Sequence, residues 1–533
     1  MKAAELFVKC LENEGVEYVF GLPGEELRDL LFALQHSKIK VVVTRHEQGA
    51  AFMADVYGRV TGRSGVCMST LGPGATNLVT GVADANLDHS PVVAITAQGS
   101  LERLHKESHQ IVNIVDMFKP ITKWNATVTS PNIINETVRK AFKLAEAEKP
   151  GATHIELPED VAAMPGQGEP LLREKVRRPA PDHKALSQAV ALIAESSRPL
   201  ILAGNGAIRK LASNQLRTFV EKTGIPVLST FMGKGAVSDR SSHSLMSIGL
   251  GTSSEISKVI DAADLIIAVG YDVAEIDPRK WNRGQKKIIH VDFTPAEVYE
   301  YYQPALEVVA DISNTLWHLN TEVKKAFQFP EAAEYRKKLE RDVFSFKSEL
   351  FPLHPKLALQ KLRQALPDSA LVISDVGAHK MWVGATFPTY ERGSVIMSNG
   401  LASMGIAVPG AIGAALACPA CQVVAICGDG GFLMNVQELE TAVRLGVNIT
   451  IVLFNDNSYS LIEAKFVHDS GKTFATDLGN PNFRKLAESF GCEYFKVESV
   501  GQLAGVFTAA LAVKGVKIVE VPVDKSKNEE LFK

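Results

Sequence analysis

Short apolar runs rich in β-branched residues alternate with longer helical stretches along almost the whole chain. Runs of this kind predict strands, and the stretches between them predict helices. Strands that alternate with helices are typical of parallel sheets flanked by helices. The pattern therefore predicts an α/β protein made of doubly wound parallel sheets.

Two interruptions divide this pattern, so we expect three consecutive domains at residues 1–165, 185–330 and 352–533. The first interruption is a Pro-, Gly- and charge-rich linker, Ala162–Lys184, and the second is a charged, helical stretch, Glu331–Glu349. A chain of 533 residues has room for about three domains. The expected strands are Lys40–Thr44, Gly65–Thr70 and Pro91–Thr96 in the first domain, Pro199–Ala203, Ala263–Gly270 and Lys287–Asp292 in the second, and Leu371–Asp375, Gln422–Cys427, Asn448–Asn455 and Lys517–Val523 in the third.

Composition excludes several classes of protein. The net charge is only −3 and no long basic run occurs, so we expect no nucleic-acid partner. The first residues lack the apolar segment of a secretory signal, and no run of about 18 apolar residues predicts a membrane span. We therefore expect a cytoplasmic protein.

The six cysteines are sparse and mostly lie in apolar runs, which is typical of reduced cytosolic thiols. Cys418 and Cys421 have the spacing of a redox or zinc motif. No second cysteine pair or nearby histidine completes a zinc site, so a loop after an Ala-rich helix is the simpler interpretation.

The most informative motif follows the expected strand Gln422–Cys427, where Gly428-Asp429-Gly430-Gly431 leads into an expected helix, Leu433–Leu445. Glycines in such a turn let backbone N–H groups approach a phosphate at the helix N-terminus. Asp456 follows the next strand, 27 residues after Asp429. Neighbouring strand ends of a parallel sheet lie side by side, so both carboxylates could bind one Mg²⁺ ion. Each motif alone is a turn or a loop; the two together predict a phosphate and metal site.

The first block has the same plan of strand, Gly-rich turn and helix. Arg45-His46-Glu47 opens the expected helix Glu47–Gly58, where Glu47 is either a functional carboxylate or a group that stabilises the helix N-terminus. Leu71–Asn77 is a Gly-rich turn before the helix Ala75–Asp84, and it brings backbone close to another group.

As a set, these segments resemble the thiamine-diphosphate-dependent enzymes. The Asp429 and Asp456 motifs resemble the thiamine-diphosphate motif, and the Glu47 segment resembles the one that carries the family's activating glutamate. The turn Gly72–Asn77 is similar to its companion loop, and Ser398–Gly413 is similar to the stretch that supports the bent shape of the cofactor. The resemblance extends in order over essentially the whole chain.

Within that family, the chain is most similar to acetolactate synthases of the catabolic type. The resemblance lies in His109-Gln110, Met117–Lys123 and Glu438–Leu445. The central block also resembles the version without a flavin, because Tyr271–Glu275 stands where flavin-binding relatives have an Arg-Phe-Asp-Asp-Arg run. We therefore expect no FAD. Two features depart from the type: Lys465 stands near the place of a substrate-facing glutamine, and the tail after the last expected strand is short.

The resemblance implies thiamine diphosphate and Mg²⁺ as cofactors, with pyrimidine-binding, central and diphosphate-binding domains. It implies that Glu47 favours the imino tautomer of the cofactor, that Met404 enforces the bent conformer, and that the Ala402 carbonyl accepts a hydrogen bond from the cofactor. The implied metal ligands are Asp429, Asp456 and the Ser458 carbonyl. The implied cofactor-binding residues are Glu47, Gly74, Asn77, Ala402, Met404, Gly428, Asp429, Gly430, Gly431, Asp456, Ser458 and Tyr459.

Gln110 and Lys465 are the candidates to contact substrate, and Glu47 is the third catalytic candidate. For Met404 an ordinary core methionine, and for Gln110 a surface amide, remain alternatives. The resemblance further implies a homodimer or homotetramer whose active site lies at a subunit interface.

The implied reaction is decarboxylation of pyruvate and transfer of the two-carbon unit to a second 2-oxo acid. The alternative is a simple 2-oxo acid decarboxylase, or another carboligase or lyase of the family. A non-catalytic relative is disfavoured because Glu47, Asp429 and Asp456 are all present. A nicotinamide oxidoreductase is disfavoured because no strand leads into a G-x-G-x-x-G turn with a downstream acidic residue.

Overall fold

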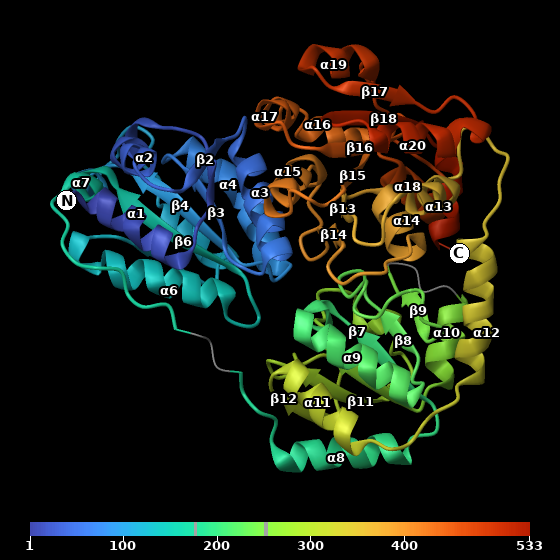
Figure 1. The fold of residues 1–533 in the computed structure, drawn as a ribbon. Helices are drawn as coiled ribbons and strands as arrows, with labels where there is room; N and C mark the ends of the chain where they lie inside the picture. Colours follow the sequence, from blue (N-terminus) through green and yellow to red (C-terminus); the bar gives the residue numbers. More distant parts are fainter. Residues whose placement is uncertain (175–177, 250–253, 533) are drawn as a thin grey trace.

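The computed structural model describes residues 1–174, 178–249 and 254–532 (Figure 1). Parts of three expected segments lie outside the described residues: 175–177 of the linker, 250–253 of the second domain and 533 of the third. Strands in the described ranges form three six-stranded sheets in which all paired strands are parallel, and helices flank each sheet. The predicted α/β class with three parallel-sheet domains is confirmed.

The first sheet has the strand order β2-β1-β3-β4-β6-β5. Its strands are β1 (Tyr18–Gly21), β2 (Lys40–Val43), β3 (Gly65–Ser69), β4 (Val92–Gln98), β5 (Trp124–Thr127) and β6 (Ala152–Pro158). The helices of this domain are α1 (Ala3–Glu14), α2 (Arg28–Gln35), α3 (Glu47–Thr61), α4 (Pro73–Leu87), α5 (Ile114–Phe118), α6 (Ile134–Glu146) and α7 (Glu159–Ala163). Every residue of β3, β4 and β6 is buried, as expected for strands covered on both faces.

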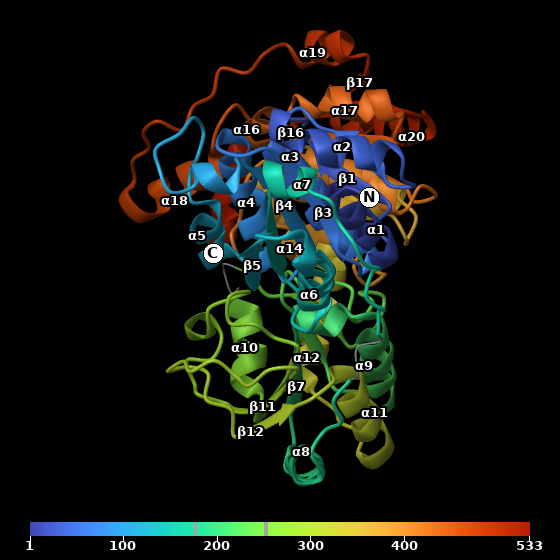
Figure 2. The same ribbon diagram turned by 90° about the vertical axis from the view of Figure 1, so that its left-hand side faces the viewer.

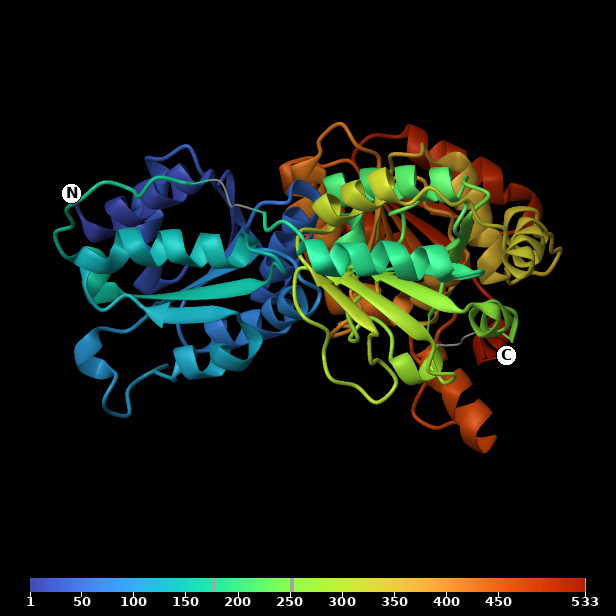
Figure 3. The same cartoon turned by 90° about the horizontal axis from the view of Figure 1, so that it is seen from below.

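The central sheet has the order β12-β11-β10-β7-β8-β9, which is a dinucleotide-fold arrangement. Its strands are β7 (Pro199–Ala203), β8 (Val227–Ser229), β9 (Ser244–Ser247), β10 (Leu265–Val269), β11 (Lys287–Asp292) and β12 (Leu306–Val309). The helices are α8 (His183–Glu195), α9 (Lys210–Thr223), α10 (Ser254–Ala262), α11 (Ile312–Glu322) and α12 (Pro330–Leu339). Seen from below, this domain lies in front of the third domain and beside the first (Figure 3).

The third sheet has the order β14-β13-β15-β16-β18-β17. Its strands are β13 (Leu371–Ser374), β14 (Val395–Met397), β15 (Val423–Gly428), β16 (Ile449–Asn455), β17 (Glu493–Lys496) and β18 (Val516–Pro522). The helices are α13 (Pro355–Ala365), α14 (Ala378–Thr386), α15 (Ala407–Ala417), α16 (Asp429–Met434), α17 (Glu438–Leu445), α18 (Ser460–Ser470), α19 (Phe483–Phe490) and α20 (Leu503–Ala512). Counted along the chain, its strands are ordered as in the first sheet, which confirms the shared plan of the two domains.

The first and third domains pack against each other through α3 and α15, which lie side by side (Figure 1). Two glycines of α15 permit this approach. A Cβ on Gly413 would lie 2.3 Å from the Met53 carbonyl oxygen, and one on Gly410 would lie 2.8 Å from Val56. Apolar residues of both helices belong to one continuous core, so the two domains share their largest buried cluster.

Two expected helices differ from the structure. The expected helix Leu433–Leu445 is two helices, α16 and α17, separated at Asn435. Asn435 lies in the break between them, where its side chain donates to the Gly405 carbonyl oxygen and to Gln48. The expected helix Glu331–Glu349 is helical only through Leu339 and a π-helical turn, Glu340–Phe344.

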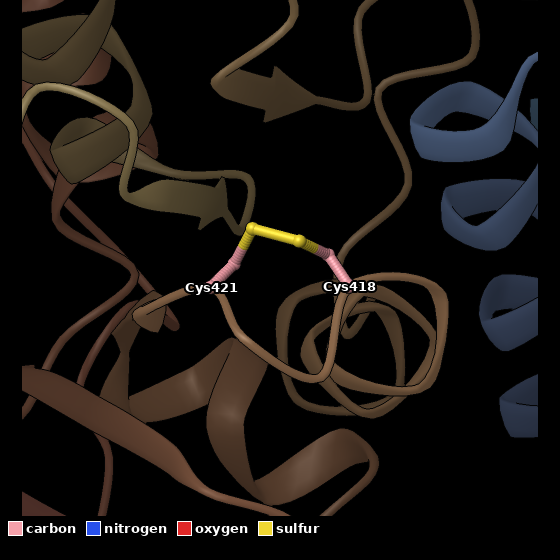
Figure 4. The surroundings of a disulfide bond; sticks show 2 residues. All are labelled: Cys418 and Cys421. Carbon is pink, nitrogen blue, oxygen red and sulfur yellow. A yellow bond between two sulfur atoms is a disulfide. The ribbon is translucent and has the colours of Figure 1, made fainter.

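One cysteine pair also corrects the sequence analysis. Cys418 and Cys421 form a disulfide across the turn that joins α15 to β15 (Figure 4), so the expectation of reduced thiols is wrong for this pair. The other cysteines, Cys10, Cys67, Cys427 and Cys492, are free and buried. No helix within the described ranges is long and apolar enough to cross a membrane.

Candidate active site

A cavity of about 260 Å³ opens at the carboxyl edge of the third sheet, where β13, β15 and β16 end. This edge is where ligands bind in open α/β sheets. The residues that line the cavity are Pro355, Val376, Gly377, Ala378, His379, Trp382, Ala402, Met404, Gly428, Asp429, Gly430, Gly431, Phe454, Asp456, Ser458, Tyr459, Ser460, Leu461, Ile462, Val523 and Asn528. All nine of the predicted cofactor and metal residues of this domain are among them. All lining residues belong to the third domain.

Asp429 and Asp456 meet at the ends of two adjacent strands, β15 and β16. One Asp429 oxygen accepts from the Gly430 N–H at 2.8 Å, and the other accepts from the Asn457 N–H at 2.7 Å. Asp456 accepts from the Ser458 N–H at 3.2 Å. The backbone after β16 therefore donates to the carboxylate after β15, and the two strand ends bring Asp429 and Asp456 close together.

Burial raises the pKa of both carboxyl groups. The pKa of Asp456 rises to about 7, mainly through burial and then through repulsion by Asp429, although a hydrogen bond from Ser460 opposes the shift. The pKa of Asp429 is also raised by burial, against hydrogen bonds that include one from Asn480. Two adjacent buried carboxylates gain most from a divalent cation that binds both.

The glycines of the turn after β15 leave space that a side chain would fill. A Cβ on Gly430 would lie 2.7 Å from the Tyr459 ring, and a Cβ on Gly431 would lie 2.7 Å from Asp375. Gly428 is the N-cap of α16, so the N–H groups of the first residues of this helix are placed to face an anion that binds there. Together with Asp429 and Asp456, this arrangement fits a diphosphate that carries Mg²⁺.

Ala402 and Met404 reach the same cavity from the loop between β14 and α15. Ala402 has a left-handed backbone with φ of 58°. A residue with a Cβ adopts this conformation at a cost, so it marks a loop that its surroundings fix firmly. Met404 is partly exposed at the cavity rather than enclosed in the core.

The predicted residues of the first domain form a separate group. Glu47 opens α3, its side chain is 8% exposed, and one of its oxygens accepts from Asn77 Nδ2 at 2.9 Å. Gly74 lies against Glu47, since a Cβ there would be 3.4 Å from its other oxygen. The backbone of Gln110, whose φ is 60°, approaches Gly72 so closely that a Cβ on Gly72 would be 2.8 Å from the Gln110 carbonyl oxygen. The first sheet therefore brings its own set of candidates to its own carboxyl edge.

These two groups do not meet in one chain. Neither Glu47 nor Gln110 lines the cavity of the third domain. Lys465 also lies outside the lining, exposed on α18 at the periphery of the molecule (Figure 2). Tyr459, by contrast, lines the cavity and stays 36% exposed.

Three residues near the cavity were missed by the sequence analysis. His379 lines the cavity, and burial lowers its pKa to about 3, so its imidazole is neutral. Asp375, whose pKa burial raises to about 6, accepts N–H groups from the loop after Met404. Asn480 donates to Asp429 at 2.7 Å. Asp375 and His379 follow β13, so the rule that sites lie at strand ends could have found them, whereas nothing near Asn480 signals its contact.

Comparison with known proteins gives matches along the chain. Residues 1–117 match the N-terminal TPP binding domain of thiamine pyrophosphate enzymes, residues 186–319 match the central domain, and residues 375–521 match the C-terminal TPP binding domain. The chain is 36% identical to "Acetolactate synthase" of Bacillus subtilis (strain 168), over 99% of this chain and 94% of that protein. It is 35% identical to "Acetolactate synthase, catabolic" of Raoultella terrigena, over 99% and 96%.

An archaeal protein, "Probable acetolactate synthase large subunit" of Methanocaldococcus jannaschii, is 34% identical over 99% of this chain and 93% of that protein. The class that the fold and cavity define is therefore that of the thiamine pyrophosphate enzymes. Within this class, the chain belongs to the acetolactate synthase family.

Proposed function

We propose that the protein is a thiamine-diphosphate- and Mg²⁺-dependent acetolactate synthase that converts two pyruvate ions and one proton into acetolactate and CO₂. The observation that supports this most strongly is the pair Asp429 and Asp456 beside a glycine turn, in a chain that matches acetolactate synthases over 99% of its length. When bound, thiamine diphosphate supplies a carbon nucleophile and an electron sink for decarboxylation.

In this proposal the third domain binds the diphosphate end of the cofactor. Asp429, Asp456 and the Ser458 carbonyl would hold Mg²⁺, while N–H groups of the turn Gly428–Gly431 would bind phosphate oxygens. Ala402 and Met404 line the cavity, where Met404 and the Ala402 carbonyl would support the ring system. These residues bind and orient, and the cavity's apolar wall, which includes Leu461 and Ile462, excludes water from the reacting atoms.

Glu47 would exchange a proton with a ring nitrogen of the aminopyrimidine. Its side chain is buried, and Asn77 orients it through the 2.9 Å hydrogen bond. A carboxyl in such surroundings is suited to proton transfer with a bound base. Gln110 and Lys465 stay proposals as substrate contacts.

We propose that a second copy of the chain completes the site, in a homodimer or a homotetramer built from such dimers. The first-domain group with Glu47 and the third-domain cavity are apart in one chain, which supports this arrangement. Large apolar side chains at the cavity and farther along the same segment are also exposed: Tyr459 and Ile462 line the cavity, and Phe466 and Phe474 follow in the chain. An exposed apolar group of this kind marks an interaction surface.

We further propose that the central domain binds no FAD. Its glycine turn after β7 is filled by the protein itself, because Glu275 accepts from the Asn205 N–H at 2.9 Å and from the Asp272 N–H at 3.0 Å. This carboxyl group takes the place that a phosphate takes at the corresponding turn of a dinucleotide fold. An absorption spectrum of the purified protein without a flavin band is the expected result, and bound flavin would contradict it.

Product analysis tests the proposed function. Purified protein is incubated with thiamine diphosphate, Mg²⁺ and pyruvate, and acetolactate and acetaldehyde are both quantified. Acetolactate as the main product, lost in Glu47→Gln and kept in Glu136→Gln, a variant of an exposed glutamate on α6 of the same domain, is the expected result. Acetaldehyde without acetolactate would make the protein a decarboxylase and would assign the difference to the wall formed by Ser460, Leu461 and Ile462.

A further inference from the structure

The loop that carries Ala402 and Met404 is fixed at both of its ends. It leaves β14 at Met397 and enters α15 at Ala407. At the downstream end, the two Asp375 oxygens accept from the Gly405 N–H at 2.8 Å and from the Ala407 N–H at 3.2 Å. Asp375 belongs to the same domain, so this end is fixed by the fold of the third domain alone.

The upstream end is fixed by the first domain. Asp88, which follows the last residue of α4, is buried, and its two oxygens accept from the Asn399 N–H at 2.9 Å and from the Gly400 N–H at 2.6 Å. One side chain thus holds two consecutive N–H groups of another domain. Because both bonds are to a charged acceptor, each is stronger than a bond between neutral groups.

Arg59 of α3 supports this contact. Its Nη2 donates to Asp88 at 3.0 Å, and its Nη1 donates to the Met397 carbonyl oxygen at 3.0 Å. Two bonds of 2.8 Å to Asp55 fix the guanidinium in turn. The Arg59 side chain is only 11% exposed and is paired, so it neutralises Asp88 and also binds Met397, the last residue before the loop.

A second contact from α4 reaches the middle of the loop. The Ser398 hydroxyl donates to Asp84 and accepts from the Ser403 N–H at 2.7 Å. Ser403 lies between Ala402 and Met404. This chain of bonds therefore connects a carboxylate of the first domain to the backbone next to the residues at the cavity.

The loop also fits closely against the end of α4. A Cβ on Gly400 would lie 2.8 Å from the Leu87 carbonyl oxygen and 3.0 Å from Asp88. Any side chain at this position would push the loop away from the first domain. The left-handed backbone of Ala402 is the type of conformation that persists only when its surroundings over-determine it.

We propose that Asp88 is a positioning residue for cofactor binding: through the N–H groups of Asn399 and Gly400, it sets where Ala402 and Met404 lie at the cavity. The first domain then has two roles, one through Glu47 and one through its contact with the third domain of its own chain. This inference rests on the proposed function only in that the cavity binds thiamine diphosphate.

The test compares Asp88→Asn with Gly400→Ala and with a matched control, Asp239→Asn. Asp88→Asn replaces one acceptor oxygen with a donor, and Gly400→Ala moves the loop without changing any charge. Asp239 is a buried carboxylate of the central domain that accepts from the Thr389 N–H of the third domain at 2.7 Å, away from the cavity. The Asp239→Asn substitution therefore weakens a buried hydrogen bond between two domains but leaves the loop of Ala402 and Met404 unchanged.

Two readouts on the full-length protein are independent of substrate turnover. The first is the dissociation constant of thiamine diphosphate with saturating Mg²⁺, followed by fluorescence quenching of Trp382, which lines the cavity. The second is the rate of hydrogen–deuterium exchange at C2 of the bound cofactor. Thermal unfolding of every variant shows how much stability each substitution removes.

We expect Asp88→Asn and Gly400→Ala to slow C2 exchange and weaken binding about ten- to a hundredfold, as the loss of one charge-assisted bond would. Asp239→Asn should stay within about twofold of the wild type, even at an equal loss of thermal stability. Binding and exchange within about twofold of the wild type in a folded Asp88→Asn or Gly400→Ala protein would overturn the proposal. A wild type that binds the cofactor but makes no acetolactate would refute only the proposed reaction.

Discussion

The first and third domains have one scaffold and carry different chemistry on it. In each sheet, candidate site residues follow the second and third strands in chain order. After β2 the first domain has Glu47, and after β14 the third domain has the loop of Ala402 and Met404. After β3 comes the turn Gly72–Asn77, and after β15 comes Gly428–Gly431.

This comparison shows that the shared scaffold determines where candidate sites lie, namely at the strand ends. The residues at those strand ends determine which group can bind there. The third domain has two adjacent carboxylates, the buried Asp429 and the partly buried Asp456, and a cavity, which suit a metal and phosphates. The first domain has one buried carboxylate held by Asn77, which suits proton transfer to a neutral ring. The following predictions separate these two roles.

The largest effect is expected from removing the proposed metal ligand Asp429 of the third domain. Asp429→Asn should give no detectable turnover and no retained cofactor, because the Mg²⁺ that joins diphosphate to protein loses a charged ligand. Isothermal titration with thiamine diphosphate and Mg²⁺ measures the binding. A chelator should inactivate the wild type in the same way, and excess Mg²⁺ should restore the wild type but not the variant. Cofactor affinity unchanged in Asp429→Asn would contradict the assignment.

Glu47→Gln should be nearly as inactive, for a different reason. Removal of a group that transfers a proton lowers turnover about 10²–10⁴-fold. Cofactor affinity should change by less than about tenfold, since the phosphate and metal contacts of the third domain remain. Steady-state kinetics and titration of the same preparation give both numbers. If Glu47→Gln lost the cofactor as Asp429→Asn does, the two half-sites would not have separate roles.

A smaller loss of stability and turnover is expected from a substitution at a contact between the third domain and the first. Glu438 of α17 is buried and accepts from the Arg45 N–H and the His46 N–H, both at 3.0 Å, just before Glu47. Glu438→Gln makes these bonds neutral, so we expect a loss of about 1–2 kcal/mol in unfolding free energy and about tenfold in turnover. Denaturant unfolding and kinetics measure the two effects.

Glu440→Gln is the matched control, on the same helix and paired only with Arg444 near the surface. It should change stability by less than about 0.5 kcal/mol. Equal effects of the Glu438 and Glu440 substitutions would show that the contact before Glu47 has no part in positioning it.

Much of this arrangement could be predicted from local sequence. The strands that end at Gly428 and Asn455 have apolar, β-branched runs, and the turns after them contain the glycines and carboxylates. The disulfide of Cys418 and Cys421 could not be predicted, because spacing alone is compatible with a free pair. The break at Asn435 contains neither Gly nor Pro, so no local signal marks it.

Contacts between the domains could not be predicted from the sequence. Arg59 and Met397 are 338 residues apart, and Asp88 and Gly400 are 312 apart. Arg59 in isolation is only a basic residue on a helix. Its role depends on the packing of α3 against α15, which is set by the whole fold rather than by any local pattern.

A mixed assembly of two inactive variants tests most directly whether the two half-sites of different copies form one active site. Glu47→Gln and Asp429→Asn chains are produced together with different affinity tags, and the mixed dimer is isolated through both tags. The account predicts that each variant alone is inactive and that the mixed dimer has about half of the wild-type activity, because one of its two sites is free of both substitutions. An inactive mixed dimer would mean that Glu47 acts on the cavity of its own chain, and it would contradict the account.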